Sequence, residues 1–452
     1  MSIVNIVLGL LGLGLVVFFH ELGHFIMARL AGVEVEEFSL GWGPKLAGFK
    51  HGTTTYRLSA FPIGGFCRMK GEDSYRKAME LGLDEFPKEQ GSYFAASPVK
   101  RIMIALAGPL MNVAFAIVVF SAVFAIGYSV QSWGNRIVLA SEFTGESYPA
   151  DTAGLKSGDA IVAINGNSVS SFAEIQEAFA LSAGRPIELS IDRNGSRFDL
   201  QVIPNMDKES GAGKVGVYAW IDTYIEALSP TGPARLAGLQ AGDVLLSVNG
   251  FAFNHSAALY DYLSRERPER VTAVFQRGET IGEAPLILVY DPDGSTDLGI
   301  FWKRLTLEIK ASGPLDALTR GWNETIKTIG ATFRGIGSLF MGVNVLRAVS
   351  GPARITWMVG QIASDGFSTG LASGITVSFN FLAILSIGLF AMNLLPIPIL
   401  DGGWIVLFLI EAVRRKAARV KTVVRYQTIG LVAIAALFLM TTVGDILFFS
   451  GR

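Results

Sequence analysis

Four stretches of this 452-residue chain carry no charge for long enough to cross a lipid bilayer, which takes about 20 residues. They are residues 3–19 (extendable to 28), 102–128, 366–400 and 426–444. Half of all residues are hydrophobic and only 17% are charged, a more apolar balance than an ordinary soluble enzyme has. The chain is therefore predicted to be a multi-domain membrane protein with an α-helical core of four spans. The first span lacks a basic leader and an A-x-A cleavage pattern, so we expect it to be retained.

Charge and cysteine content exclude several classes of function. The net charge is −1, which gives no general basic field for nucleic acid. The single cysteine, Cys67, excludes an intramolecular disulfide and a zinc site built from several thiolates.

Basic residues between the third and fourth spans indicate the orientation of the chain. This short loop holds one acid, Glu411, and six bases: Arg414, Arg415, Lys416, Arg419, Lys421 and Arg425. Short loops rich in Lys and Arg lie on the cytoplasmic side. Counting crossings backwards, we expect residues 29–101 to be cytoplasmic too, with both termini and the long segment from about 130 to 365 outside.

The outer segment contains an internal repeat. "AGLKSGDAIVAINGNSV" (153–169) aligns without gaps with "AGLQAGDVLLSVNGFAF" (237–253), which predicts two tandem copies of one module. The shared pattern resembles the PDZ domain, which binds extended peptides by strand addition. The expected carboxylate loops, in residues 214–220 and 297–303, follow the signature, so we expect circularly permuted modules. Two packing modules that bind nothing are the alternative.

The sequence His20-Glu21-Leu22-Gly23-His24 places ionisable groups at the end of an apolar span, where they are costly and suggest a function. On a helix, residues four apart share a face, so both imidazoles can bind one Zn²⁺. Catalytic zinc takes three protein ligands and leaves one position for water. Glu21 would lie beside the metal and act as the general base. His51 and His255 lack such a context and are expected to be surface or turn residues.

Topology selects Asp401 as the third ligand. The first and third spans run in the same direction, and the third ends in "NLLPIPILDGG" (393–403), which puts Asp401 at the depth of the histidines. Asp365 and Asp445 fall at the outer side in this arrangement. Because Pro396 and Pro398 cannot continue a helix smoothly, we expect this segment to unwind and direct the carboxylate toward zinc. A simple helix cap at Asp401 is the alternative.

Together these motifs resemble the site-2 protease family of intramembrane metalloproteases, in its RseP-type bacterial branch. Further matching stretches are "EFSLGWGPKL" (37–46), "FPIGGFCRMKGED" (61–73) and "AGPLMN" (107–112). The resemblance implies His20, His24 and Asp401 as zinc ligands and Glu21 as the catalytic base. The candidate substrate-binding residues are Asn393, Asn112, Pro396, Pro398, Gly64 and Gly65. Trp404 is assigned no role.

Two further segments have expected structures. Residues 55–69 read as a membrane-associated β-hairpin that turns at Pro-Ile-Gly-Gly (62–65). If it dips into the membrane, its edge would pair with an unwound substrate as an added strand; a cytoplasmic hairpin that only packs is the alternative. Residues 314–349 read as an amphipathic helix at the membrane interface, or as a solvated linker helix.

The predicted domains are residues 1–130 and 366–452 (transmembrane core), 131–210 and 211–310 (PDZ domains, β-rich α+β) and 311–365 (interfacial helix). The resemblance implies intramembrane proteolysis of an already trimmed single-pass protein of the anti-sigma factor type, and of signal peptide remnants. Peptide C-termini at the PDZ domains and the lipid bilayer are further expected partners. The expected location is the bacterial inner membrane, with the active site near the cytoplasmic side and the PDZ domains periplasmic. An idle PDZ scaffold is the alternative, and an ion transporter ranks last because repeated membrane halves are absent from the sequence.

Overall fold

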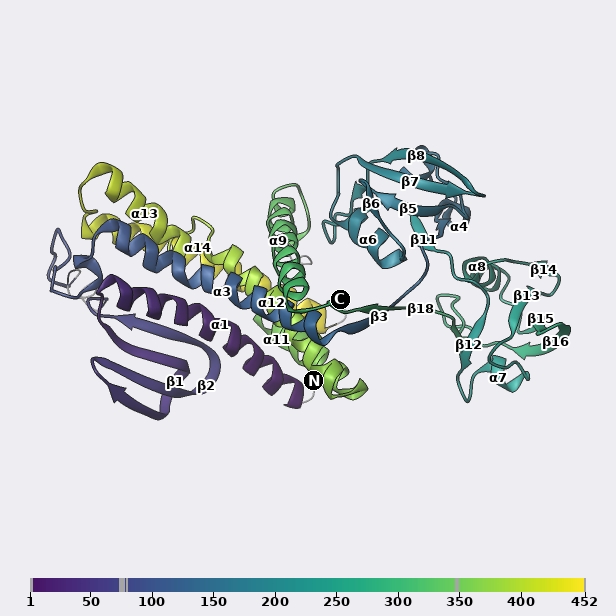
Figure 1. The fold of residues 1–452 in the computed structure, drawn as a ribbon, viewed down its shortest axis with the longest axis horizontal. Coiled ribbons are helices and arrows are strands. Elements are labelled where there is room, and N and C mark those ends of the chain that lie inside the picture. Colours follow the sequence, from purple (N-terminus) through teal and green to yellow (C-terminus); the bar gives the residue numbers. More distant parts are fainter. Residues whose placement is uncertain (1–2, 73–77, 79, 346–348, 451–452) are drawn as a thin grey trace. The chain divides into compact units, whose positions relative to one another are not determined.

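The computed structural model describes residues 3–72, 78, 80–345 and 349–450 (Figure 1). It divides into two compact units, Met1–Tyr128 with Ile309–Arg452, and Ser129–Glu308. The first unit, called the membrane unit below, contains the long apolar helices. The second is built from short strands and small helices.

Four helices of the membrane unit are long and apolar enough to cross a bilayer: α1 (Ile3–Ala31), α3 (Pro98–Ile126), α12 (Leu371–Asn393) and α14 (Val420–Phe449). The other elements of this unit are β1 (Val35–His51), β2 (Thr54–Met69), η1 (Tyr93–Ala95), α9 (Pro314–Leu339), α11 (Pro352–Thr369) and α13 (Asp401–Arg414). A helix of 29 residues such as α1 or α3 extends beyond the hydrocarbon layer, since each residue adds about 1.5 Å.

The prediction for the third span was wrong at both ends. Gly370, with φ 147°, separates α11 from α12, so the span begins at Leu371. It ends at Asn393, and residues 394–400 are not helical. The predicted amphipathic helix is also shorter, because α9 ends at Leu339; residues 346–348 of that prediction lie outside the described part of the chain.

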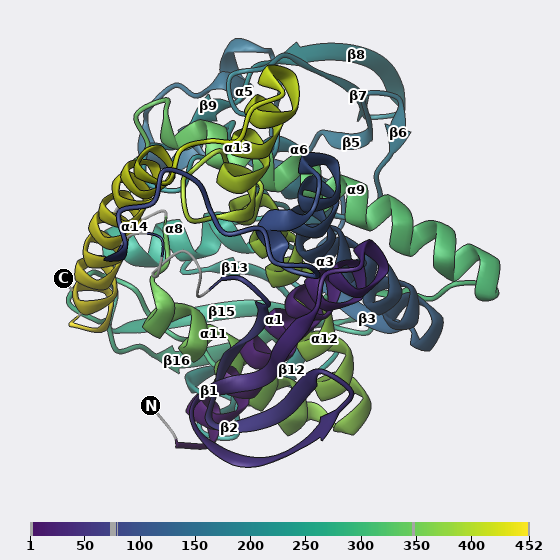
Figure 2. The same cartoon turned by 90° about the vertical axis from the view of Figure 1, so that its left-hand side faces the viewer.

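The predicted hairpin also turns at another place. The connection between β1 and β2 lies at residues 52–53, whereas Pro62–Gly65 lie within β2. Residues of β1 near Phe38 have neighbours on both sides, because Phe38 is opposite both Tyr56 and Cys67. The two halves of β2 therefore flank the first half of β1, and the Pro-Ile-Gly-Gly stretch connects those halves. Figures 1 and 2 show this sheet lying along α1.

Apolar side chains hold the spans together. One buried cluster joins Val16 of α1, Phe120 of α3 and Leu382 and Ile387 of α12. Many other apolar side chains of these helices are exposed, including Ile429, Val432 and Leu439 of α14. Helices that expose apolar residues so widely are suited to a lipid surround and not to water.

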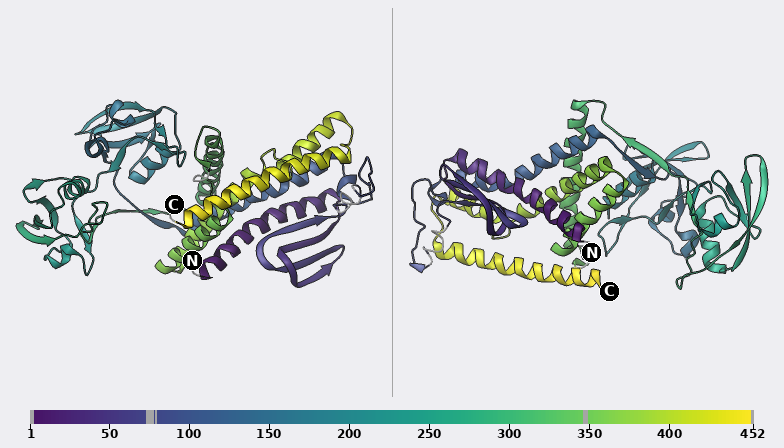
Figure 3. Two further views of the ribbon diagram at one scale, coloured as in Figure 1. Left: turned by 180° about the vertical axis from the view of Figure 1, so that it is seen from behind. Right: turned by 90° about the horizontal axis from the view of Figure 1, so that it is seen from below.

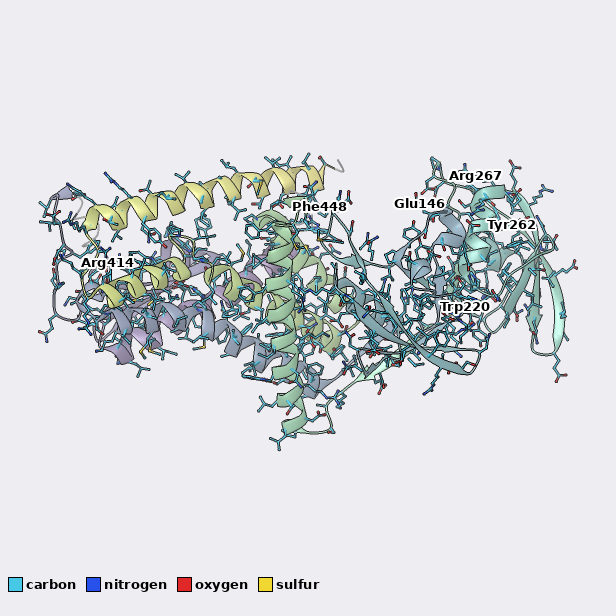
Figure 4. The ribbon with its side chains drawn as sticks, turned by 90° about the horizontal axis from the view of Figure 1, so that it is seen from above. Glu146, Trp220, Tyr262, Arg267, Arg414 and Phe448 are labelled. Atoms are coloured by element: carbon cyan, nitrogen blue, oxygen red, sulfur yellow. The ribbon has the colours of Figure 1, made fainter. Side chains whose placement is uncertain are left out.

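A buried carboxylate joins α14 to α11. Asp445 accepts backbone hydrogen bonds from Gly351, Ala353 and Arg354, at 2.9, 3.0 and 3.1 Å, and so caps the first turn of α11. Phe448, labelled in Figure 4, lies under the Arg354 guanidinium one turn further along α14. The view from below in Figure 3 (right) shows α14, in yellow, running apart from most of the other helices. Asp445 therefore satisfies a helix end that would otherwise be unpaired inside an apolar unit.

The second unit contains two copies of one α+β module. The first has the sheet order β6-β5-β7-β8, formed by Asn167–Ser168, Ala160–Ile164, Ile187–Arg193 and Ser196–Val202, with α6 (Phe172–Ala180). The second has β14-β13-β15-β16, formed by Phe251–Ala252, Val244–Val248, Arg270–Arg277 and Thr280–Ile287, with α8 (Ser256–Glu266). Smaller elements are β3 (Tyr128–Ser132), β4 (Ile137–Leu139), α4 (Ser141–Thr144), α5 (Pro149–Thr152), β9 (Asn205–Met206), β10 (Gly213–Lys214), β11 (Val217–Ala219), β12 (Ile225–Leu228), α7 (Pro233–Leu236), β17 (Ile300–Trp302) and β18 (Leu305–Ile309).

A repeated ion pair shows that the modules share more than the repeated motif. Arg193 binds Asp159 and the carbonyl of Gly154 in the first module. Arg277 binds Asp243 and the carbonyl of Gly238 at the matching positions of the second. The first module also extends past the predicted boundary at residue 210, because apolar residues as late as Ala219 belong to its core.

We expect Asp445→Ala to lower the thermal unfolding midpoint of the detergent-purified protein by several degrees. Three backbone donors would lose their acceptor, and a buried unpaired donor costs about 1 to 3 kcal/mol. Asp365→Ala is the matched control, because that aspartate is exposed and bonds only within α11, to Gln361. Equal midpoints for the two variants would contradict the capping role of Asp445.

Candidate metal centre

Two imidazoles face each other on the inner side of α1. His20 and His24 are both buried, and their Nε2 atoms lie 3.1 Å apart. Their rings are nearly perpendicular, at 82°, with centroids 4.8 Å apart. The four-residue spacing of a regular helix is sufficient to place both nitrogens at one point.

Asp401 brings a carboxylate to the same point from a distant part of the sequence. Its Oδ2 lies 3.2 Å from His20 Nε2, and its Oδ1 lies 3.5 Å from His24 Nε2. One ligand atom from each of the three residues can be chosen so that all lie within 4.8 Å of one another. The structure therefore brings together the three residues that the sequence suggested as ligands.

The chain between α12 and α13 directs Asp401 inward. This loop contains Pro396 and Pro398, and Ile399 follows with φ 81°, a left-handed conformation that is strained for a β-branched residue. Gly402 and Gly403 open α13 directly against carbonyl groups of the same loop, so that any side chain there would overlap them. The strained turn and the two glycines together fold the loop tightly enough to point Asp401 at α1.

Two neighbours orient the imidazoles. His24 Nδ1 lies 2.8 Å from the carbonyl oxygen of Ile104, which requires an N–H at Nδ1 and leaves Nε2 with a free lone pair. The amide nitrogen of Asn112 lies 3.2 Å from His20 Nδ1, while its buried Oδ1 lacks a hydrogen-bond partner. A half-turn of this amide would let Oδ1 accept from Nδ1–H and would free His20 Nε2 in the same way. Such partners commonly fix the tautomer of metal-binding histidines.

The donor set fits a divalent transition metal. Two imidazole nitrogens and one carboxylate oxygen are the ligand types that catalytic zinc sites use. Asp401 Oδ2 is buried and has no hydrogen-bond partner, as expected for an atom that binds a cation.

Glu21 occupies the position next to the two histidines. Its side chain lines the same cavity as Cys67 of β2. Its side chain also lies close to Gly65 of the same strand. Burial, together with the neighbouring Glu21 carboxylate, raises the pKa of the Cys67 thiol.

A cavity of about 680 Å³ opens onto these groups. It is lined by His20, Glu21, His24 and Asp401, with Cys67 and Met69 of β2, Leu389 and Asn393 of α12, and Trp404 of α13. Its volume lies within the range of small-molecule and peptide-binding pockets. The Asn393 amide nitrogen lies 3.5 Å from His20 Nε2, at the end of α12, where the sequence suggested a substrate contact.

Several other candidates lie away from this cavity wall. Pro396 and Pro398 shape the loop but do not line the cavity, and neither do Gly64 and Gly65, although Gly65 touches Glu21. Asp365 lies on α11 and accepts a hydrogen bond from Gln361 of the same helix, and Asp445 accepts from the N–H of Gly351 at the start of α11. His255 lies at a bend, one of the two expected places, but it is buried and not at the surface, and it caps α8 by accepting from the N–H of Ala258.

A buried ion pair that no sequence motif marks holds α13 against α3. Arg101 donates to Glu411 at 2.6 Å, and its guanidinium lies 4.4 Å from the ring centre of Phe408. The other Glu411 oxygen accepts from the N–H of Ala418. Since Asp401 begins the helix that carries Glu411, this pair positions the third ligand from the far end of α13.

The model of peptidase family M50 matches residues 8–437. A Treponema pallidum protein named "Putative zinc metalloprotease" is 36% identical over 446 residues, covering 98% of this chain and 99% of its own. A Borreliella burgdorferi protein of the same name is 28% identical, covering 94% of each chain.

Two solved structures each cover less than a fifth of this chain. The PDZ domain of an SdrC-like protein from Listeria monocytogenes is 24% identical, with a TM-score of 0.17, covering 19% of this chain and 90% of its own. A solution structure of GtR34C from Geobacillus thermodenitrificans is 31% identical, with a TM-score of 0.16, covering 18% and 95%.

We expect Asp401→Asn to lose most of the Zn²⁺ that the purified protein retains, because a neutral amide oxygen is a weaker ligand than a carboxylate. Asp365→Asn makes the same chemical change on α11 and should retain the metal content of the unmodified protein. Metal analysis by mass spectrometry after identical purification measures both. Equal zinc in the two variants would remove Asp401 from the ligand set.

Proposed function

The chain belongs to peptidase family M50 and is a membrane-embedded zinc metalloprotease, and we propose that it cleaves within the transmembrane segment of a trimmed single-pass protein. The observation that carries this proposal is the convergence of three ligand residues beside Glu21. His20 and His24 lie on α1, a helix long enough to span a bilayer, and Asp401 begins the shorter helix α13. A peptide bond that reaches this point must itself lie within the membrane layer or at its edge.

Bound zinc would polarise the scissile carbonyl and lower the pKa of water to about 7. In this proposal, residues of the chain transfer the proton and orient the metal ligands. Glu21 accepts the proton of the attacking water and then donates it to the leaving amine. Asn112 and the Ile104 carbonyl orient the two imidazoles.

The substrate must be extended locally before it is cut, because helical peptide groups are already hydrogen-bonded and shielded by side chains. The stretch of β2 around Cys67 runs directly beside Glu21 and lines the cavity. We infer that an unwound substrate adds to this edge as a further strand. The Asn393 amide, which also lines the cavity, would bond the substrate backbone.

The distribution of charge supports an orientation for the proposed protease. The basic loop between α13 and α14 would be cytoplasmic, which puts the metal centre near that side and Ser129–Glu308 outside. The two modules in that unit would be PDZ domains. They would admit substrates whose outer domain has been removed, and their sheet edges would offer sites for peptide C-termini.

This arrangement suits two groups of substrates in the bacterial inner membrane. Anti-sigma factor proteins left by a first cleavage present one span and a short outer stub. Signal peptide remnants have the same form. Both would enter from the lipid bilayer, and the second unit would exclude intact proteins with bulky outer domains.

Glu21→Gln should retain zinc but lower the cleavage rate by about 10² to 10⁴-fold, the usual contribution of a general acid–base group. Cleavage of a trimmed single-pass substrate in proteoliposomes measures this. Glu36→Gln, at an exposed residue of β1, is the control and should cleave normally. Cleavage by Glu21→Gln at the control rate would refute Glu21 as the base.

Gly64→Ala tests the role of the β2 edge. Gly64 has φ 80° and lies beside Trp42 and Val17, whereas Gly52 has φ 59° at the hairpin tip with open space around it. An alanine side chain strains either position by about 1 to 2 kcal/mol. We expect Gly64→Ala to lower cleavage at least several-fold while zinc content stays unchanged, and Gly52→Ala to cleave normally. Equal effects of the two variants would contradict substrate pairing at this edge.

A further inference from the structure

A second cavity, of about 490 Å³, lies between the start of α3 and the end of α13. The first turn of α3 (Ser97, Pro98 and Val99) forms one wall, and Arg415 and Lys416 after α13 form another. Figure 4 labels Arg414, the last residue of α13, at this end of the membrane unit, at the other end from Phe448. The cavity takes no part in the proposed chemistry.

The charges on its walls do not balance. Two of its basic residues already have acidic partners, since Arg101 pairs with Glu411 at 2.6 Å and Lys88 with Glu85 at 3.6 Å. Arg415 and Lys416 have no ion-pair partner in the described part of the chain, and both are exposed. The cavity therefore carries two unpaired positive charges. The amino-terminal end of the 29-residue α3 adds a partial positive charge to the same space.

The surroundings of the cavity are those of a lipid headgroup. Two membrane-spanning helices, α3 and α14, begin at this level, at Pro98 and Val420. Apolar side chains next to the basic ones are widely exposed, with Val413 at 83% and Val99 at 61%. The acyl chains of a lipid can lie along such residues while the phosphate of its headgroup contacts the basic side chains of the cavity.

We propose that this cavity binds the headgroup of an acidic phospholipid, with Arg415 and Lys416 contacting the phosphate. The proposal rests on the chain being embedded in a membrane and does not depend on the substrate proposed above. Zwitterionic lipids would bind less well, because their own cation cancels the attraction. The bound lipid would steady the end of α13, the helix that begins with Asp401.

The test compares two double variants of the full-length protein with equal loss of charge. Arg415→Gln/Lys416→Gln removes the unpaired charges of the cavity. Lys421→Gln/Arg425→Gln removes two exposed charges from the same basic region, outside the cavity lining. Each protein is incorporated into phosphatidylcholine vesicles that contain phosphatidylglycerol, released in mild detergent, and examined for retained lipid by native mass spectrometry.

We expect the unmodified protein and the Lys421/Arg425 variant to retain phosphatidylglycerol in preference to phosphatidylcholine. The Arg415/Lys416 variant should bind it about 30-fold more weakly, which corresponds to roughly 1 kcal/mol for each of the two basic side chains. If both double variants lost phosphatidylglycerol binding to the same extent, the binding would come from diffuse surface charge and the proposal would be overturned. Equal retention of the two lipids would also overturn it, as would displacement of phosphatidylglycerol by inorganic phosphate, which would indicate a site for free phosphate. Circular dichroism of each variant separates these results from misfolding.

Discussion

The convergence of two imidazoles and one carboxylate on a single point inside apolar helices is the interaction on which the rest of the membrane unit depends. Ionisable groups are costly in such surroundings unless they bind one another or a metal. His20, His24 and Asp401 meet this condition, with ligand atoms within 4.8 Å of each other. The elements around them can then be understood by how each one keeps the three groups together.

Asp401 needs more support than the histidines, because α1 alone places His20 and His24 correctly. The position of Asp401 is set by the non-helical loop after Asn393, which includes the strained Ile399, and by the two glycines at the start of α13. The Arg101–Glu411 pair holds the other end of α13 against α3. Tyr426 of α14 donates to the carbonyl of Gly403, which adds the last span to the same assembly. Fold and catalytic chemistry therefore share one set of contacts.

Local patterns predicted much of this arrangement from the sequence. The i, i+4 histidines, the two prolines before Asp401 and the long apolar runs each act through short-range geometry, and the spans and the site followed from them. The hairpin was misplaced because Pro62–Gly65 has the composition of a turn, whereas pairing of Phe38 with both halves of β2 is a long-range property. The Arg101–Glu411 pair was missed for the same reason: 310 residues separate its members, and neither belongs to a motif.

X-ray absorption at the zinc edge of the purified protein tests the central claim most directly, because it reports the atoms around the metal whether or not a substrate is present. The account predicts a first shell of nitrogen and oxygen only, with the outer-shell signature of two imidazole rings. A sulfur neighbour, or a shell with fewer than two imidazoles, would contradict the convergence of His20, His24 and Asp401 on one zinc ion.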